Sequence, residues 1–250
     1  MEYLLGFLIA LAVGLTGMGG GVLTTPLLIL GLGLPAHEAV AVALLFSTLT
    51  KVIATPFYAS RGQLSWPVAK LLLIGGLPGV IAGSFLLNKT STKSLEPYVL
   101  TIVGATIVVM TALTFLKPLF AKAQPKERMH LLPWLALPIG LEVGFSSAGA
   151  GALGSLLLLS CTTLTPSAVV GTDLFFGLVI SAAGGSWHAL TQPINTALLW
   201  KLSTGGVAGA LLGAWLGTRI PTRALRTALS AFLFFLGGQL CWKGLGVLVR

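Results

Sequence analysis

Two glycine clusters flanked by hydroxyl side chains are the strongest candidates for a ligand site in this sequence. Glycine lets a backbone approach a ligand without a Cβ, and Ser and Thr hydroxyls donate hydrogen bonds to the oxygens of an anion. If each cluster separates two half-helices, the free N–H groups and the dipole at the start of the second half also favour an anion. We therefore predict an anion site built from both clusters. Its residues are Thr16, Gly19, Gly20, Gly21, Thr24 and Thr25 around the first cluster, and Ser146, Ser147, Gly149, Gly151 and Ser155 around the second.

Ionisable residues inside or beside long apolar stretches form a second group of candidates. A charge at the centre of a membrane helix costs ~3 kcal/mol on insertion scales, so such a residue needs a reason to be there. We assign Lys51 and Thr172 to the anion site, and Asp173, Glu142 and His188 to the transfer of a coupling proton. Two alternatives stay open for Lys51: it pairs with Asp173, or its long side chain extends to the cytoplasmic interface. Near the outer end of its helix, His188 also fits a partly hydrated interface position.

The composition shows what kind of molecule must position these residues. Hydrophobic residues make up 55% of the 250 residues and charged residues only 8%, whereas a soluble domain carries roughly 25% charged residues. This excludes a soluble enzyme, a disordered chain and a disulfide scaffold, and indicates a polytopic membrane protein. The net charge of +9 is not gathered into one arm that could follow a nucleic acid. Cys161 and Cys241 form no metal-binding pattern, so we expect no metal and no cofactor.

Six apolar segments have the length of about 20 residues that a membrane-spanning helix needs. They are residues 38–59, 68–88, 97–116, 167–189, 195–217 and 225–248. Two further segments, 3–34 and 132–160, are too long for one crossing and contain the glycine clusters. Because glycine destabilises a helix interior, each is either a discontinuous crossing or a re-entrant hairpin of two half-helices. The competing interpretation of the clusters is close packing, since small residues are common where membrane helices touch.

The chain repeats itself. The constant offset that places Gly19 on Gly149, which we call the repeat offset, also superimposes two rows of glycines that we expect to be packing faces. These rows are Gly75, Gly79 and Gly83, and Gly205, Gly209 and Gly213. We predict a first transmembrane repeat at 1–116, a basic cytoplasmic linker at 117–131 and a second repeat at 132–250. Broken segments at corresponding positions of two halves indicate the binding site of a transporter.

The distribution of basic residues favours the hairpin alternative. With two hairpins, each half has three full crossings, so the repeats are inverted and both chain ends face outward. The loops then divide their basic residues nine to three, against seven to five for single crossings, and positive residues collect in cytoplasmic loops. The nine are Arg61, Lys70, Lys117, Lys122, Lys126, Arg128, Arg219, Arg223 and Arg226; the three are Lys89, Lys93 and Arg250.

Three stretches of the sequence resemble the TauE/SafE sulfite exporter family. They are Gly17-Met18-Gly19-Gly20-Gly21-Val22-Leu23-Thr24-Thr25-Pro26-Leu27-Leu28, Tyr58-Ala59-Ser60-Arg61-Gly62-Gln63-Leu64-Ser65-Trp66, and Val170-Gly171-Thr172-Asp173-Leu174 followed by His188. The length, the duplication and the linker position agree with that family. The resemblance implies a multi-pass protein of the cytoplasmic (inner) membrane that moves sulfur-containing anions such as sulfite and organosulfonates.

We therefore expect a secondary transporter, not an enzyme, that carries a small anion of the sulfite, thiosulfate or organosulfonate class by alternating access. The ligand would bind between the two broken segments near the bilayer midplane. Its partners would be the lipid bilayer and, if flux is coupled, protons; a homo-oligomer stays open. The alternative is an anion or small-solute channel with a glycine-lined pore. An intramembrane hydrolase is disfavoured, because Ala148 follows Ser147 and His188 is the one plausible base in a crossing. The chain has no nucleotide-binding motif for ATP.

Overall fold

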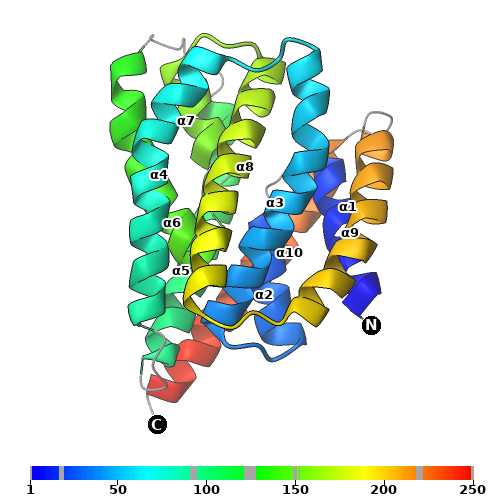
Figure 1. Ribbon diagram of the computed structural model, residues 1–250, viewed down its shortest axis with the longest axis vertical. Helices are drawn as coiled ribbons and strands as arrows, with labels where there is room; N and C mark the ends of the chain where they lie inside the picture. Colours follow the sequence, from blue (N-terminus) through cyan, green and yellow to red (C-terminus); the bar gives the residue numbers. More distant parts are fainter. Residues whose placement is uncertain are drawn as a thin grey trace.

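The computed structural model describes residues 2–16, 20–90, 95–120, 128–148, 151, 153–217 and 222–248. Within these ranges, the side chains at 14–16, 114–120, 214–217, 222–230, 247 and 248 are outside the description. The elements in chain order are α1 (Glu2–Thr16), α2 (Gly20–Gly31), α3 (Ala36–Ser60), α4 (Trp66–Lys89), α5 (Glu96–Phe120), the 3-10 helix η1 (Met129–Leu131), α6 (Leu132–Ser146), α7 (Leu153–Cys161), α8 (Pro166–Thr191), α9 (Thr196–Gly217) and α10 (Thr222–Leu248) (Figure 1).

The described part of the chain is helical, with no strand, and the prediction of an all-α multi-pass membrane protein is confirmed. The six predicted crossings coincide with α3, α4, α5, α8, α9 and α10 to within a few residues. Five stretches among the described residues are long and apolar enough to span a membrane. They are Ala36–Ser60, Trp66–Lys89, Glu96–Leu113, Met129–Ser146 and Pro166–Thr191. The helix α5 continues into the predicted linker and ends at Phe120.

Each predicted broken segment consists of two helices, and the break falls at its glycine cluster. The first segment contains α1 and α2, and the second contains α6 and α7. Ser147, the residue directly after α6, caps the helix: it has a left-handed φ of 63° and donates its backbone N–H to the carbonyl of Val143 at 2.8 Å. A residue in this conformation is a common way to end a helix. Two predicted site residues in the breaks, Gly19 and Gly149, lie outside the described residues.

The second pair of helices returns to the end of the bundle from which it starts. The Arg128 N–H, just before η1, donates to the carbonyl of Cys161 at 3.0 Å, which joins the start of α6 to the end of α7. The loop after α7 leads directly into α8. The start of α8 lies beside the end of α3, because the Ser65 N–H after α3 donates to Thr172 Oγ1 at 3.0 Å. The start of α6 and the end of α7 therefore both lie at the end of the bundle where α3 ends and α8 begins.

In the first pair, the start of α1 and the end of α2 lie at the opposite end of the bundle. The helix α2 leads into the start of α3, and Gln192 Nε2, just after α8, donates to the carbonyl of His37 in the first turn of α3 at 3.4 Å. An ion pair of 2.8 Å between Glu2 and Lys201 joins the start of α1 to the start of α9, which follows α8. Figure 1 shows α1 beginning and α10 ending at the lower end, the same end at which α3 begins.

Glycines bring the helices of one half directly against the helices of the other. A Cβ at Gly75, Gly79 or Gly83 of α4 would overlap the carbonyl oxygen of Pro133, Leu137 or Leu141 of α6. The same relation holds between α9 and α1, where a Cβ at Gly205 or Gly209 would overlap the carbonyl oxygen of Tyr3 or Phe7. The repeat offset maps the contacts of Gly75 and Gly79 onto those of Gly205 and Gly209. The expectation that these glycines form packing faces is confirmed for the five positions named here.

The helices α3 and α8 cross in an antiparallel manner in the middle of the bundle. A run on α3 from Ala39 to Leu44 is fully buried. The backbone of Gly171 packs against Tyr58, and Gly185 packs against Leu45, which fixes the register between the two helices. Residues near the end of α3 therefore face residues near the start of α8.

A reporter fused after Arg250 should lie on the opposite side of the membrane from a reporter inserted at 121–127. The basic residues at the α5–α6 end should hold that end in the cytoplasm. The reporter is an introduced cysteine, and its labelling by a membrane-impermeant reagent in intact cells shows on which side of the membrane each position lies. If both reporters were found on the same side of the membrane, the arrangement of the two helix pairs described above would be wrong.

Candidate functional site

Each broken segment has an inner end at its break, which we call its tip: the start of α2 at the first break, and the end of α6 with the start of α7 at the second. The two tips touch inside the bundle through hydroxyl groups. Ser147 Oγ at the end of α6 lies 2.5 Å from Thr25 Oγ1 in α2, and it also contacts the carbonyl oxygen of Gly21 at 3.2 Å. Thr24, Thr25 and Ser147 are all buried. The structure therefore brings together predicted site residues that lie far apart in the chain, in different halves.

The first turn of α2 can approach the end of α6 because residue 21 has no side chain. A Cβ at Gly21 would overlap the carbonyl oxygen of Ser147. Gly151 has a φ of 106°, a conformation that L side chains rarely adopt. Because a side chain at position 21 would overlap Ser147, the glycine there has a packing role at the contact between the tips. The side chain of Thr16 lies outside the described residues, and Gly20 begins α2.

Hydroxyls at the second tip bond mainly to their own segment. Ser146 Oγ donates to Glu142 Oε1, one turn earlier in α6, and accepts from the Ala148 N–H at 3.2 Å. Ser155 Oγ donates to the carbonyl of Gly151. The carboxyl group of Glu142 is thus directed along α6 toward the tip, where Ser147 meets α2.

The ammonium group of Lys51 is enclosed at the crossing of α3 and α8. The residue is 5% exposed, and its Nζ donates to Ser181 Oγ at 3.2 Å. Asp173 lies on the same helix as Ser181, about two turns earlier in α8, and is also buried. The predicted alternative in which Lys51 extends to the interface is wrong, because a buried hydroxyl holds the ammonium inside the protein.

The side chain of Asp173, a residue of α8, packs against the start of α7. A Cβ at Gly154, in the first turn of α7, would overlap Asp173 Oδ1, so the carboxyl group packs directly on that backbone. The positive end of the α7 dipole stabilises a negative charge there. The repeat offset maps Gly154 onto Thr24 and Asp173 onto Ala43. The carboxyl group in the second half thus occupies space next to a glycine, where the first half has a threonine next to an alanine.

Thr172 lies where the loop after α3 meets the first turns of α8. It is buried and accepts the Ser65 N–H, while a Cβ at its neighbour Gly171 would overlap the carbonyl oxygen of Gln63. These contacts hold the loop between α3 and α4 against the start of α8. Among the described residues, no hydrogen bond joins Thr172 to the hydroxyls of the two tips.

His188 is fully buried, so its predicted alternative as a partly hydrated interface residue is wrong. Gln192 Nε2 donates to the carbonyl of His37, and it lies 3.1 Å from His188 Nδ1. Since this nitrogen of Gln192 is a donor, Nδ1 accepts, and the proton of the neutral ring is on Nε2. His188 Nε2 donates to the carbonyl of Gly144 at 3.5 Å, near the tip of α6. Ser84 Oγ of α4 donates to the same carbonyl at 3.4 Å.

Nearly the whole chain is similar to a known protein family. The sequence profile of the family described as sulfite exporter TauE/SafE matches residues 3–240. The chain belongs to the TauE/SafE family.

The curated relatives of this TauE/SafE protein are named as membrane transporters. The probable membrane transporter protein YjnA of Bacillus subtilis (strain 168) is 28% identical over 248 residues, which cover 95% of this chain and 97% of the relative. The probable membrane transporter protein YtnM of the same organism is 26% identical over 245 residues, covering 94% and 80%. A probable membrane transporter protein of Xylella fastidiosa (strain Temecula1 / ATCC 700964) is 25% identical over 229 residues, covering 86% and 83%. No solved structure matches the chain significantly.

Some polar residues with contacts inside this TauE/SafE protein escape prediction from the sequence, among them Ser84 and Ser181, which are buried, and Gln192, which is partly buried. Each is a common residue type in an apolar stretch, and nothing in its own neighbourhood indicates a contact. For Ser181 a signal exists, because the repeat offset maps Lys51 onto it. Residues related in this way meet where α3 and α8 cross. Among the described residues, no group of three His, Cys, Asp or Glu residues could hold a metal ion.

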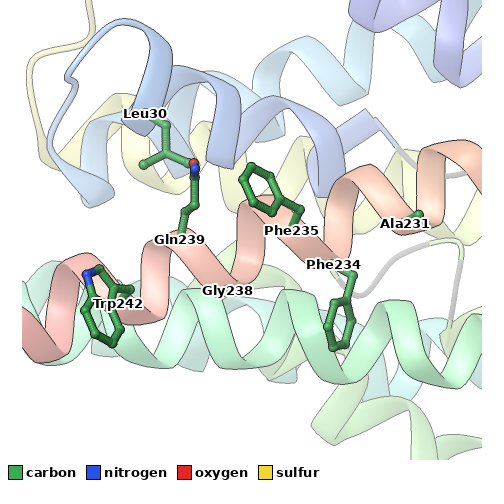
Figure 2. Close-up of a pocket in the computed structure, with 7 residues that line it drawn as sticks. All are labelled: Leu30, Ala231, Phe234, Phe235, Gly238, Gln239 and Trp242. Carbon is green, nitrogen blue, oxygen red and sulfur yellow. The ribbon is translucent and has the colours of Figure 1, made fainter.

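The groove in Figure 2 is separate from the candidate site of the TauE/SafE protein. It has a volume of about 550 Å³ and lies between α10 and the end of α2. Its lining residues are Leu30, Ala231, Phe234, Phe235, Gly238, Gln239 and Trp242. All of these except Leu30 are exposed, and apart from Gly238 and Gln239 they have apolar side chains, as is usual for a surface that faces lipid. Contact with lipid therefore accounts for this surface.

The variant Ser147→Ala should lower the free energy of unfolding by ~1–3 kcal/mol, because it removes buried hydrogen bonds at the contact between the tips. The variant Ser147→Gly loses the same bonds, but it relieves the cost of about 1–2 kcal/mol that a Cβ imposes in the left-handed region. Unfolding in detergent measures both. We expect the glycine variant to be the more stable of the two. If it were the less stable, the left-handed helix end at Ser147 would be contradicted.

Proposed function

We propose that this TauE/SafE protein is a secondary transporter that moves a small sulfur-containing anion, such as sulfite, thiosulfate or an organosulfonate, across the cytoplasmic membrane. The contact of the two tips through Thr25 and Ser147 is the observation that carries the proposal. It places hydroxyl groups and the ends of half-helices from both halves of the chain inside the bundle. Irregular backbone at such a depth is tolerated only beside protein or a water-filled cavity.

The anion would bind near this contact, in the region between the tips and the crossing of α3 and α8. The helices α2 and α7 begin directly after the two breaks, and the first N–H groups of a helix have no partner within the helix itself. Lys51 would supply the positive charge, since of the described Lys and Arg side chains it is the one that is buried. The glycines of the clusters other than Gly21, whose open side Ser147 fills, would let the ligand approach the backbone, and Thr172 would support the site from the start of α8.

The two halves would be inverted repeats, and the bodies that move would contain helices from both halves. The contacts of α4 with α6 and of α9 with α1 support this arrangement, because they correspond under the repeat offset. These backbone contacts join each pair too closely for its members to slide apart. Alternating access would then move α6 and α7 together with α4, relative to α1 and α2 together with α9.

Protons would couple to this movement through buried titratable groups. Asp173 contacts the start of α7, Glu142 reaches the end of α6, and His188 bonds to the carbonyl of Gly144 in the last turns of α6. Each group therefore lies where a change of its charge alters the environment of a half-helix end. Transfer of a proton to or from one of them would favour one arrangement of the tips over the other.

Flux in proteoliposomes tests the proposal, with sulfite, thiosulfate, sulfoacetate and sulfate as substrates and acetate as the carboxylate control. We expect saturable counterflow of a labelled sulfur anion, driven by the same anion on the opposite side. Flux of acetate without flux of any sulfur anion would overturn the substrate class. Single-channel currents without counterflow would overturn the carrier mechanism in favour of a pore.

A further inference from the structure

Lys51 and Thr55 lie one helical turn apart on the face of α3 that meets α8. Residues spaced by four project from the same side of a helix. Both are buried, with 5% and 6% of their surface exposed. The face of α8 opposite them carries Asp173, Gly177 and Ser181, which are also spaced by four and also buried. The crossing of α3 and α8 is therefore polar, although apolar side chains surround it.

The hydroxyl group of Thr55 has an unusual environment. Among the described residues, Thr55 Oγ1 is buried and has no hydrogen-bond partner. Two other threonines of α3 use the ordinary solution, in which the hydroxyl donates to a carbonyl of the preceding turn. Thr48 Oγ1 donates to Leu44 at 2.9 Å and Thr50 Oγ1 donates to Ser47 at 2.9 Å. Because a buried polar group without a partner is costly, the Thr55 hydroxyl is a candidate donor to a bound ligand.

The register of the crossing places Thr55 near the charged groups. Tyr58 packs on Gly171 and Leu45 packs on Gly185, so successive turns of α3 face successive turns of α8 in reverse order. The turn that carries Thr55 is therefore level with the turn of α8 that carries Asp173. Lys51 reaches across one turn further along, where its Nζ donates to Ser181 Oγ at 3.2 Å. An ammonium group has three donors, and this bond uses one of them.

We propose that Lys51, Thr55 and Ser181 form a subsite for one oxyanion group of the substrate, in the class of sulfite or a terminal –SO₃ group. The inference rests on the proposed function and specifies where the charged end of the substrate binds. One ammonium and two hydroxyl groups provide donors for the three oxygens on one face of such a group. The negative charge of the substrate then lies against the positive charge of Lys51. Thr55 and Ser181 are the residues that select a multi-oxygen head group.

The experiment compares the KM for counterflow of labelled sulfite and thiosulfate among variants of α3 and α8 in proteoliposomes. The test variant is Thr55→Val, which keeps the shape of the side chain and removes the hydroxyl. Thr50→Val is the matched control, because Thr50 is equally buried on the same helix and its hydroxyl bonds within the helix. Thr55→Ser keeps the hydroxyl, and Ser181→Ala removes the second one. Unfolding in detergent is recorded for each variant.

We expect Thr55→Val and Ser181→Ala each to raise the KM about tenfold or more, as for the loss of a hydrogen bond to a charged group. Thr50→Val and Thr55→Ser should keep the KM of the wild type. The unfolding midpoint of Thr55→Val should not fall, because its hydroxyl has no partner to lose. A tenfold increase that also appeared in Thr50→Val would overturn the subsite, since it would reflect a general disturbance of α3.

The outcomes for the subsite and for the proposed function can be separated. Counterflow of sulfite by the wild type with an unchanged KM in Thr55→Val would overturn the subsite and leave the proposed function standing. Counterflow of acetate alone, weakened by Thr55→Val, would overturn the sulfur substrate and support an anion subsite at Thr55. Absence of counterflow for every anion tested with folded wild-type protein would overturn both.

Discussion

The variant Lys51→Met should reduce the counterflow of labelled sulfite by at least about 100-fold, as for the loss of one member of a buried charged pair. An anion that enters the bundle loses its water, and a buried charge without a partner is very unfavourable. Of the described cationic side chains, the ammonium of Lys51 is the one placed inside the protein to compensate that loss. Initial rates in proteoliposomes, normalised to the amount of folded protein, measure the effect.

The control for this prediction is Lys201→Met on α9. Lys201 pairs with Glu2 at the surface, with side chains 41% and 34% exposed, and such a pair contributes little to stability. This variant should therefore transport at nearly the wild-type rate. A second comparison separates binding from folding. Lys51→Met removes the buried positive charge on the face of α3 that meets the Asp173 face of α8, which we expect to lower the free energy of unfolding by ~3–5 kcal/mol. Adding Asp173→Asn should restore stability without restoring flux; wild-type flux in Lys51→Met would exclude Lys51 from the anion site.

The variant Gly21→Ala should lower the free energy of unfolding by about 3 kcal/mol, at the upper end of the range for overpacking, and should abolish transport. The added methyl group would overlap the carbonyl oxygen of Ser147, so α2 and α6 would have to move apart at their tips. This movement would also break the contact between Ser147 and Thr25. Chemical unfolding in detergent and counterflow on the same preparation measure the two effects.

Gly31→Ala is the matched control, because it makes the same change in the same helix. A Cβ at Gly31, the last residue of α2, would meet nothing within 4 Å. Its stability should stay the same or rise slightly, since alanine favours a helix over glycine by up to ~1 kcal/mol. Equal stability of Gly21→Ala and Gly31→Ala would show that the tips do not touch as described.

The sequence predicts the helical framework well because a membrane imposes simple rules on it. A spanning helix needs a long apolar run, and the ends of such runs are visible at Arg61 and Lys89. The glycine clusters predict the two breaks for a similar reason, since glycine interrupts a helix. The rows of glycine beginning at Gly75 and Gly205 predict packing faces, but they do not identify the partner helix. That information comes from the three-dimensional arrangement, in which each row contacts the other half of the chain.

The candidate site is less predictable, because side-chain contacts depend on the angle and depth of each helix. Charge alone marks Lys51 and Asp173 as unusual, yet it does not distinguish an interface position of Lys51 from the buried one that the structure shows. The sequence likewise does not distinguish a hydrated interface position of His188 from the buried one, because its burial depends on how α8 lies beside the end of α6. Thr55 has no signal at all in the sequence, because most threonines in such helices bond to their own backbone.

The glycine contacts between the halves also determine when the molecule can assemble. During synthesis α1 enters the membrane before α9, its packing partner, and α2 to α8 are made between them. The helix α4 likewise precedes the α6 that covers its glycine row. The α1–α2 hairpin must therefore remain inserted beside lipid until most of the remaining chain has followed. It follows that neither half can complete its packing alone, and that the two halves expressed as separate polypeptides should assemble with each other rather than fold independently.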